Sequence, residues 1–216
     1  MTAVARYALA DYLRSQRFLP PLVTYLAFLA IFYAFEGPVL PGYGAGAATL
    51  LPVAVWLTLG LHNTEDRLQA MVTAVNAGGH RRALFGKTYA ALVCVLVLTA
   101  VALLWPALSA ARLPAPADLA VGVCAHLICG LTGIALGTCC VRPLVERQGY
   151  AFAAAALLSL IALVGRWVTP VNETVRVLSD APPRPPAAEL LLLAAWAVAM
   201  LLGLTLLTAL LGQRRR

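Results

Sequence analysis

The chain contains 216 residues, of which 62% are hydrophobic and 12% are charged, and its mean hydropathy is +0.85. Soluble domains carry about 25% charged residues, so this composition excludes a soluble globular domain, and its apolar content excludes intrinsic disorder. The net charge of +7 comes from 16 Lys and Arg against 9 Asp and Glu. Because the basic residues stand between apolar runs, orientation in a membrane explains them better than nucleic-acid binding. We therefore expect a polytopic membrane protein with no nucleic-acid partner.

Residues 1–17 are predicted to form an amphipathic helix that lies in the cytoplasmic interface of the membrane. On a helical wheel the charged residues share an arc of about 140°, and apolar residues fill most of the remainder. The charged set is Arg6, Asp11, Arg14 and Arg17, and the apolar set is Val4, Ala8, Leu9, Tyr12 and Leu13. The alternative is a plain solvated N-terminus.

Residues 18–216 are predicted to form a six-helix transmembrane domain, since one helical crossing requires about 20 apolar residues. The six runs cover residues 18–35, 43–61, 88–108, 119–141, 150–168 and 190–211. Helices are expected because backbone groups in lipid must be hydrogen-bonded internally, and the runs are too long and evenly apolar for barrel strands. The predicted fold class is an all-α membrane protein. It has six transmembrane helices, an N-terminal interfacial helix and a short cytoplasmic helix between the second and third crossings.

The basic residues predict the orientation of the chain. Twelve of the 16 lie on one predicted side of the membrane, and four lie on the other. The first group is Arg6, Arg14, Arg17, Arg67, Arg81, Arg82, Lys87, Arg142, Arg147, Arg214, Arg215 and Arg216, and the second is Arg112, Arg166, Arg176 and Arg184. Since loops rich in Lys and Arg stay in the cytoplasm, both termini are predicted to be cytoplasmic, which agrees with an even number of crossings. The Ala-, Arg- and Pro-rich composition indicates a bacterial cytoplasmic membrane.

The longest predicted cytoplasmic loop, residues 62–87, contains a helix of about 12 residues. Asn63 or Thr64 is the expected N-cap of this helix. Glu65 and Asp66 then fall in its first turn, where negative charge interacts favourably with the helix dipole.

This loop helix carries one apolar stripe with the spacing i, i+3, i+4, i+7, formed by Leu68, Met71, Val72 and Val75. Gly78 and Gly79 are expected to end the helix, which is too short to span a membrane. A short helix with one apolar stripe needs another surface that shields the stripe from water. The helix is therefore predicted to lie on the membrane, to pack under the bundle or to dock into a partner protein.

The longest predicted external segment covers residues 169–188, and its proline-rich half is interpreted as a connector. Its second part, Pro182–Pro186, is rich in proline and is predicted to be stiff and extended. The sequence reading assigns no helix to this segment.

No catalytic or nucleotide-binding site is evident in the sequence. Gly86-Lys87-Thr88 ends like a phosphate-binding loop, but that loop requires a glycine where Arg81 stands. No acidic residue lies within a crossing, which excludes an intramembrane protease with a buried Asp pair. The chain is therefore expected not to be an enzyme and to hold no metal or cofactor of its own.

His126 is the one clearly intramembrane ionisable residue in the sequence, and such a residue is a candidate proton relay or ligand contact. The commoner case is a neutral histidine that is hydrogen-bonded across helices. On the same crossing, Gly133 and Gly137 have the spacing that lets two helices approach closely, within the chain or between copies.

The layout of these elements resembles the permease subunit of a type-2 ABC exporter. The most specific stretch runs from Thr64-Glu65-Asp66-Arg67 to Gly79-His80-Arg81-Arg82-Ala83-Leu84-Phe85-Gly86-Lys87. It has an acidic start, a striped helix, basic residues and a closing Gly-Lys ahead of the third crossing. The likeness covers the whole chain in layout and about 25 residues in sequence pattern.

The resemblance implies two permease copies, or this chain with a homologue, served by two copies of a separate ATPase that binds ATP and Mg²⁺. The loop helix would be the coupling helix, seated in a groove of the ATPase. Its stripe of Leu68, Met71, Val72 and Val75 would fill the groove or brace the helix against the bundle. The polar contacts would come from Glu65, Asp66, Arg67, Arg81 and Arg82.

The expected function is that of an exporter permease for an amphipathic or hydrophobic substrate, such as a drug, a lipid-like molecule or a peptide. Two other classes stay open: a non-transporting accessory, immunity or interaction subunit, and a membrane-embedded enzyme. A cluster of polar side chains at one membrane face would favour the enzyme.

Overall fold

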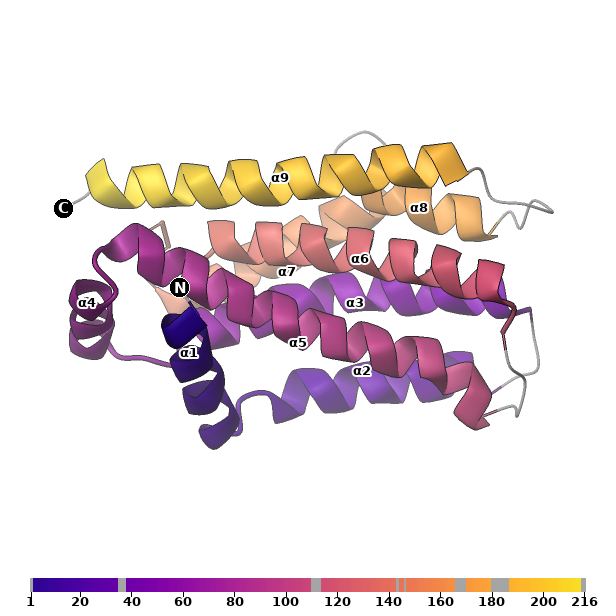
Figure 1. Cartoon of the computed structure of the whole chain (residues 1–216), viewed down its shortest axis with the longest axis horizontal. Helices are drawn as coiled ribbons and strands as arrows, with labels where there is room; N and C mark the ends of the chain where they lie inside the picture. Colours follow the sequence, from indigo (N-terminus) through magenta and orange to yellow (C-terminus); the bar gives the residue numbers. More distant parts are fainter. Residues whose placement is uncertain are drawn as a thin grey trace.

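The structure is a computed structural model that describes most of the chain. The described residues are 2–34, 38–109, 114–142, 144–145, 147–165, 170–179 and 187–214. They form the helices α1 (Thr2–Arg14), α2 (Leu19–Phe32), α3 (Val39–His62), α4 (Arg67–Asn76), α5 (His80–Ser109), α6 (Pro116–Cys139), α7 (Gln148–Val164), α8 (Pro170–Ser179) and α9 (Ala187–Arg214). The long helices run along one common axis, and α4 lies at the end of the bundle where α9 finishes (Figure 1). The all-helical class predicted from the sequence is confirmed.

Four described helices, α3, α5, α6 and α9, are long and apolar enough to cross a membrane. They correspond to the second, third, fourth and sixth predicted crossings. Helix α2 has 14 residues and α7 has 17, so they measure only about 21 and 26 Å against a hydrocarbon core of roughly 30 Å. Helices α1 and α2 reach the required length together, but as a pair bent by 79°. The described residues thus indicate a multi-pass membrane protein with four or five spans, and six crossings remain a prediction.

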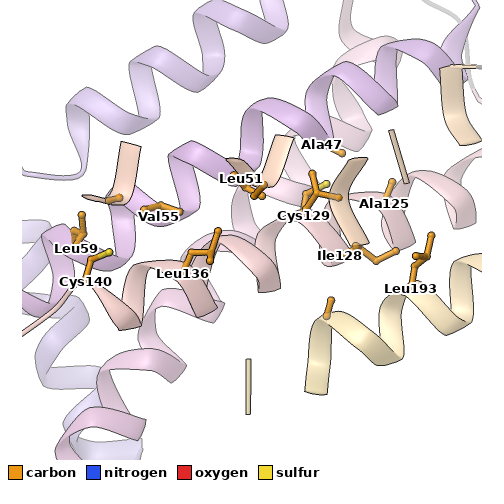
Figure 2. Close-up of a cluster of buried hydrophobic side chains, with 14 of the residues drawn as sticks. Ala47, Leu51, Val55, Leu59, Ala125, Ile128, Cys129, Leu136, Cys140 and Leu193 are labelled. Atoms are coloured by element: carbon orange, nitrogen blue, oxygen red, sulfur yellow. The ribbon is translucent and has the colours of Figure 1, made fainter. Parts of the chain in front are cut away.

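The core of the bundle lies between α3 and α6, with α9 packed against α6. Figure 2 shows Leu51 and Val55 of α3 beside the α6 side chains Cys129 and Leu136, and Leu193 of α9 near Ile128 of α6. Because the buried side chains are mainly Leu, Val, Ile and Ala, apolar packing holds these helices together.

Two glycines of α6 allow this close contact. A Cβ atom at Gly133 would lie 2.6 Å from the backbone oxygen of Leu51, and one at Gly137 would lie 2.7 Å from the Cβ atom of Thr58. Any larger residue would push the two backbones apart. The close helix approach expected from the glycine spacing is present, and it occurs within the chain, between α3 and α6.

The N-terminal helix forms as expected, over Thr2–Arg14, and turns sharply into α2. One of its faces is buried against the bundle through Ala5, Ala8 and Tyr12. The Tyr12 ring lies against Gly60 of α3, where a Cβ atom would come within 3.0 Å of it. Helix α1 is therefore fixed to α3 and α5 as well as being amphipathic.

Helix α8 (Pro170–Ser179) lies in the first half of the external segment, for which the sequence predicted no element. The Asn172 side chain donates to the backbone oxygen of Leu163 at 2.7 Å, which ties the start of α8 to the end of α7. Its buried residues Pro170, Val171, Thr174, Val177 and Leu178 insert against α3, α6 and α9. The predicted extended stretch, Pro182–Pro186, lies outside the described residues.

Candidate functional site

The loop helix predicted between residues 62 and 87 exists as α4, but it begins later than expected. Asp66 is its N-cap, with backbone in the extended region and its Oδ1 accepting from the backbone N–H of Gln69 at 2.7 Å. Asn63 and Thr64 were wrongly predicted as caps, because they complete the end of α3. The Asn63 N–H donates to Leu59, and the Thr64 hydroxyl donates to a carbonyl of the preceding turn. The acidic pair therefore precedes the first turn.

The end of α4 follows the sequence prediction. The N–H of Gly79 donates back to the Ala74 oxygen at 2.8 Å. Gly78 has a φ of 76° and Gly79 a φ of 130°, a backbone region that glycine enters without strain. The chain can therefore reverse within two residues and begin α5 at His80, about two helical turns before the predicted third crossing at residue 88.

The apolar stripe of α4 faces away from the bundle. Leu68, Met71, Val72 and Val75 keep between 45 and 79% of their surface exposed. On the opposite face of the same helix Ala74 is buried. Packing of the stripe under the chain's own bundle, one of the three alternatives left by the sequence, is therefore excluded. Lipid or a partner protein must cover this surface, since four adjacent apolar side chains form an unfavourable patch in water.

A buried ion pair fixes the base of α4 to α5. The Lys87 ammonium lies 2.7 Å from Glu65 Oε2, and the two side chains are only 9 and 2% exposed. The Thr73 hydroxyl of α4 donates to the other carboxylate oxygen of Glu65, also at 2.7 Å. Both oxygens of a buried carboxylate are thus hydrogen-bonded. This arrangement, which we name the Glu65 clamp, holds α4 at a set angle to the bundle.

The remaining predicted polar residues lie at the same end of the bundle. Arg67 is the first residue of α4, and Arg81 and Arg82 lie in the first turn of α5. All three are exposed. Gln69 of α4 donates to the Tyr7 hydroxyl of α1, so the N-terminal helix also contacts α4.

Two members of the Glu65 clamp were not identified from the sequence. Lys87 was interpreted only as the closing residue of the loop, and Thr73 was assigned no role. The acidic residue and its partners are 8 and 22 positions apart, and no periodic pattern links them. One signal was available: Lys87 directly precedes an apolar run, so a carboxylate partner was required for it to be buried.

His126 is fully buried on α6 in an arrangement that differs from the expected bond across helices. Its Nδ1 lies 2.7 Å from the backbone oxygen of Gly122 on the same helix, so this nitrogen carries the proton. Its Nε2 has no hydrogen-bond partner among the described residues and faces Gly46 of α3. The ring also packs edge-on against Tyr43, with 6.0 Å between centroids. These contacts favour a packing role in which the imidazole fills space beside a glycine.

Replacement of His126 by Ala is expected to reduce stability by about 3 kcal/mol, because it leaves a cavity beside Gly46 and removes the Tyr43 contact. Thermal unfolding of the purified chain in detergent measures this change. Cys124→Ala on the same helix, at a half-buried position, is the matched control and is expected to cost less than about 1 kcal/mol. A His126→Ala chain that unfolds like the wild type would contradict the packing role.

The described part of this end of the bundle combines a rigidly held helix, an outward apolar stripe and a surrounding set of basic side chains. It contains no group of His, Cys, Asp and Glu residues placed to hold a metal ion. What this end presents is an apolar surface along α4 with charged groups at its edges. Comparisons of this chain with protein-family models, with curated proteins and with solved structures find no match.

Proposed function

We propose that this chain is the permease subunit of an ATP-driven exporter in the bacterial cytoplasmic membrane, with both termini in the cytoplasm. Helix α4 docks into a separate ATPase subunit that binds ATP and Mg²⁺. The observation that carries the proposal is the exposed stripe of α4, formed by Leu68, Met71, Val72 and Val75, on a helix that is itself fixed to the bundle. A partner groove that takes up the apolar face of a short helix is a common recognition mode.

The Glu65 clamp supports a mechanical role for α4. A docked helix transmits movement only if its attachment to the transmembrane helices is stiff. The Lys87–Glu65 pair connects α4 directly to α5, and the Gln69–Tyr7 contact connects it to α1. Closure of the ATPase around ATP would then move α4 together with α5 and α1.

The packing of α3 against α6 suggests where a substrate path would lie. Their backbones approach so closely at Gly133 that no path fits between them. The buried hydroxyls of Thr58, Thr132 and Thr138 donate to carbonyls of their own helices and offer no polar lining. We therefore place the path between this chain and a second permease copy or a homologue, with apolar walls that suit an amphipathic or hydrophobic substrate such as a drug, a lipid-like molecule or a peptide.

Met71→Glu is expected to dissociate the ATPase from the permease, because it places a charge within the apolar contact surface. The measurement is purification of the tagged chain from its native membrane in a mild neutral detergent, followed by assay of Mg²⁺-dependent ATP hydrolysis in the complex. We expect at least a tenfold loss of copurifying ATPase activity, since a buried unpaired charge costs more than about 1.4 kcal/mol.

Met71→Leu is the matched control, because it keeps an apolar side chain of similar volume, and it should retain the complex. Both variants should insert in the membrane at wild-type levels, since residue 71 is exposed in the isolated chain. Unchanged ATPase activity in the Met71→Glu complex would contradict the assignment of α4. A stable complex whose partner hydrolyses no ATP would instead favour an accessory or interaction subunit that uses the same stripe.

A further inference from the structure

A cavity of about 620 Å³ lies between α4 and the ends of the neighbouring helices. Its walls include His62 at the end of α3, Lys87 on α5 and Arg142 after α6. Each of these residues stands where the apolar part of a transmembrane helix gives way to polar sequence. The cavity is therefore at the depth at which lipid head groups lie beside the bundle.

The charge that remains free in this cavity is positive. Glu65 is paired with Lys87. Asp66 accepts a backbone N–H and keeps its negative charge, but Arg67, Arg142 and Arg147 on the same wall outnumber it. Arg67 and Arg142 line the cavity and form no ion pair among the described residues. A second hollow of about 270 Å³ shares both arginines, so their guanidinium groups stand between two open spaces.

Two other parts of the cavity wall restrict which kind of ligand the cavity can bind. The Nε2 atom of His62 is buried without a hydrogen-bond partner. Because Nδ1 donates to the backbone oxygen of Thr58, Nε2 carries no proton and can accept a hydrogen bond from a hydroxyl group. Leu84 and Val141 give the cavity an apolar side. Guanidinium groups, a hydroxyl acceptor and an apolar wall match a phosphate group that carries a polyol and an acyl chain.

We propose that this cavity binds the phosphate-bearing head group of an anionic phospholipid. Arg67 and Arg142 contact the phosphate, His62 accepts from a head-group hydroxyl, and the apolar wall takes the start of the acyl chains. A free phosphate would satisfy the arginines alone. The position of the cavity at head-group depth and its apolar side favour the lipid. Of the four stripe residues only Met71 borders the cavity, and the proposed lipid contacts come from other residues, so binding requires no ATPase.

The test is thermal unfolding of the purified full-length chain in a neutral detergent, titrated with phosphatidylglycerol, with phosphatidylcholine or with inorganic phosphate. We expect saturable stabilisation by phosphatidylglycerol and little by the other two. The double variant R67Q/R142Q should bind phosphatidylglycerol about 25-fold more weakly, since each of the two basic residues contributes a factor of about five. Arg14→Gln, an exposed basic residue of α1 away from the cavity, should bind like the wild type.

Three results would overturn the proposal. Equal stabilisation by phosphatidylcholine would show that the head-group charge is not recognised. Equal stabilisation by inorganic phosphate would identify a soluble anion as the ligand. Undiminished phosphatidylglycerol binding by R67Q/R142Q, with loss of the ATPase complex, would assign the two arginines to protein docking. Native mass spectrometry of the same samples measures retained lipid directly, so a variant of lower stability still gives a readable result.

Discussion

Gly133→Ala is expected to lower the stability of the chain by about 3 kcal/mol or more, one of the two largest effects expected for a single substitution. The added Cβ atom would lie 2.6 Å from the Leu51 oxygen and 2.7 Å from the Cβ atom of Ala54. Both neighbours belong to the backbone or lie next to it, so neither can rotate away. Relief requires α3 and α6 to separate, which opens the core along the whole interface.

Thermal unfolding in detergent measures the effect, and a decrease in Tm of about 10 °C corresponds to this change in free energy. Gly203→Ala on α9 is the matched control, because nothing lies within 4 Å of a Cβ atom there. It should leave Tm unchanged or raise it slightly, since alanine is favoured over glycine within a helix by about 1 kcal/mol. Similar Tm values for the two variants would mean that α3 and α6 do not pack as closely as described.

The parts of the fold that the sequence predicted are those set by local pattern. Apolar runs of more than 18 residues predicted α3, α5, α6 and α9, because the length needed to cross lipid is a simple requirement. The stripe spacing and the closing glycines predicted α4, apart from its first residues. The small-residue spacing at Gly133 and Gly137 predicted a close helix approach, although not which helix would provide the partner surface.

The parts that the sequence missed depend on partners far along the chain. Helix α8 is short, and its buried face of Val171, Thr174 and Leu178 becomes apparent only once α3 and α6 are placed beside it. Its spacing of three and four residues, with Pro170 at its first position, is a helix signal that the proline-rich residues following it obscured. His126 was expected to bond across helices, but the glycine opposite it offers no side chain.

The candidate site likewise has one part that the sequence predicted and one part that it did not. Its apolar stripe could be read from four residues, because periodicity identifies a face whether or not it is covered. Whether that face was exposed could not be read, because exposure depends on how α4 is attached. Glu65 and Lys87 decide the attachment, and their pairing is a tertiary contact across 22 positions.

Lys87→Met is expected to destabilise the α4 region by about 3–5 kcal/mol, because it leaves the Glu65 carboxylate buried without a counter-charge. Thr73 would still donate one hydrogen bond, which is not enough to offset the desolvation of a full charge. The expected consequence is local release of α4. Limited trypsin digestion of the purified chain should then cut near Arg67 and Arg81 at least tenfold faster than in the wild type.

Two further variants separate the loss of a buried charge pair from a general loss of packing. The double variant E65Q/K87M has no buried charge, so it should recover at least about 2 kcal/mol relative to Lys87→Met alone. Arg176→Met removes a partner from the exposed Glu173–Arg176 pair of α8, whose side chains are 30 and 56% exposed. It should cost less than about 1 kcal/mol, because water solvates the remaining carboxylate. If E65Q/K87M releases α4 as readily as Lys87→Met, the ion pair does not hold the helix, and α4 must owe its position to the Tyr7–Gln69 contact and to the burial of Ala74.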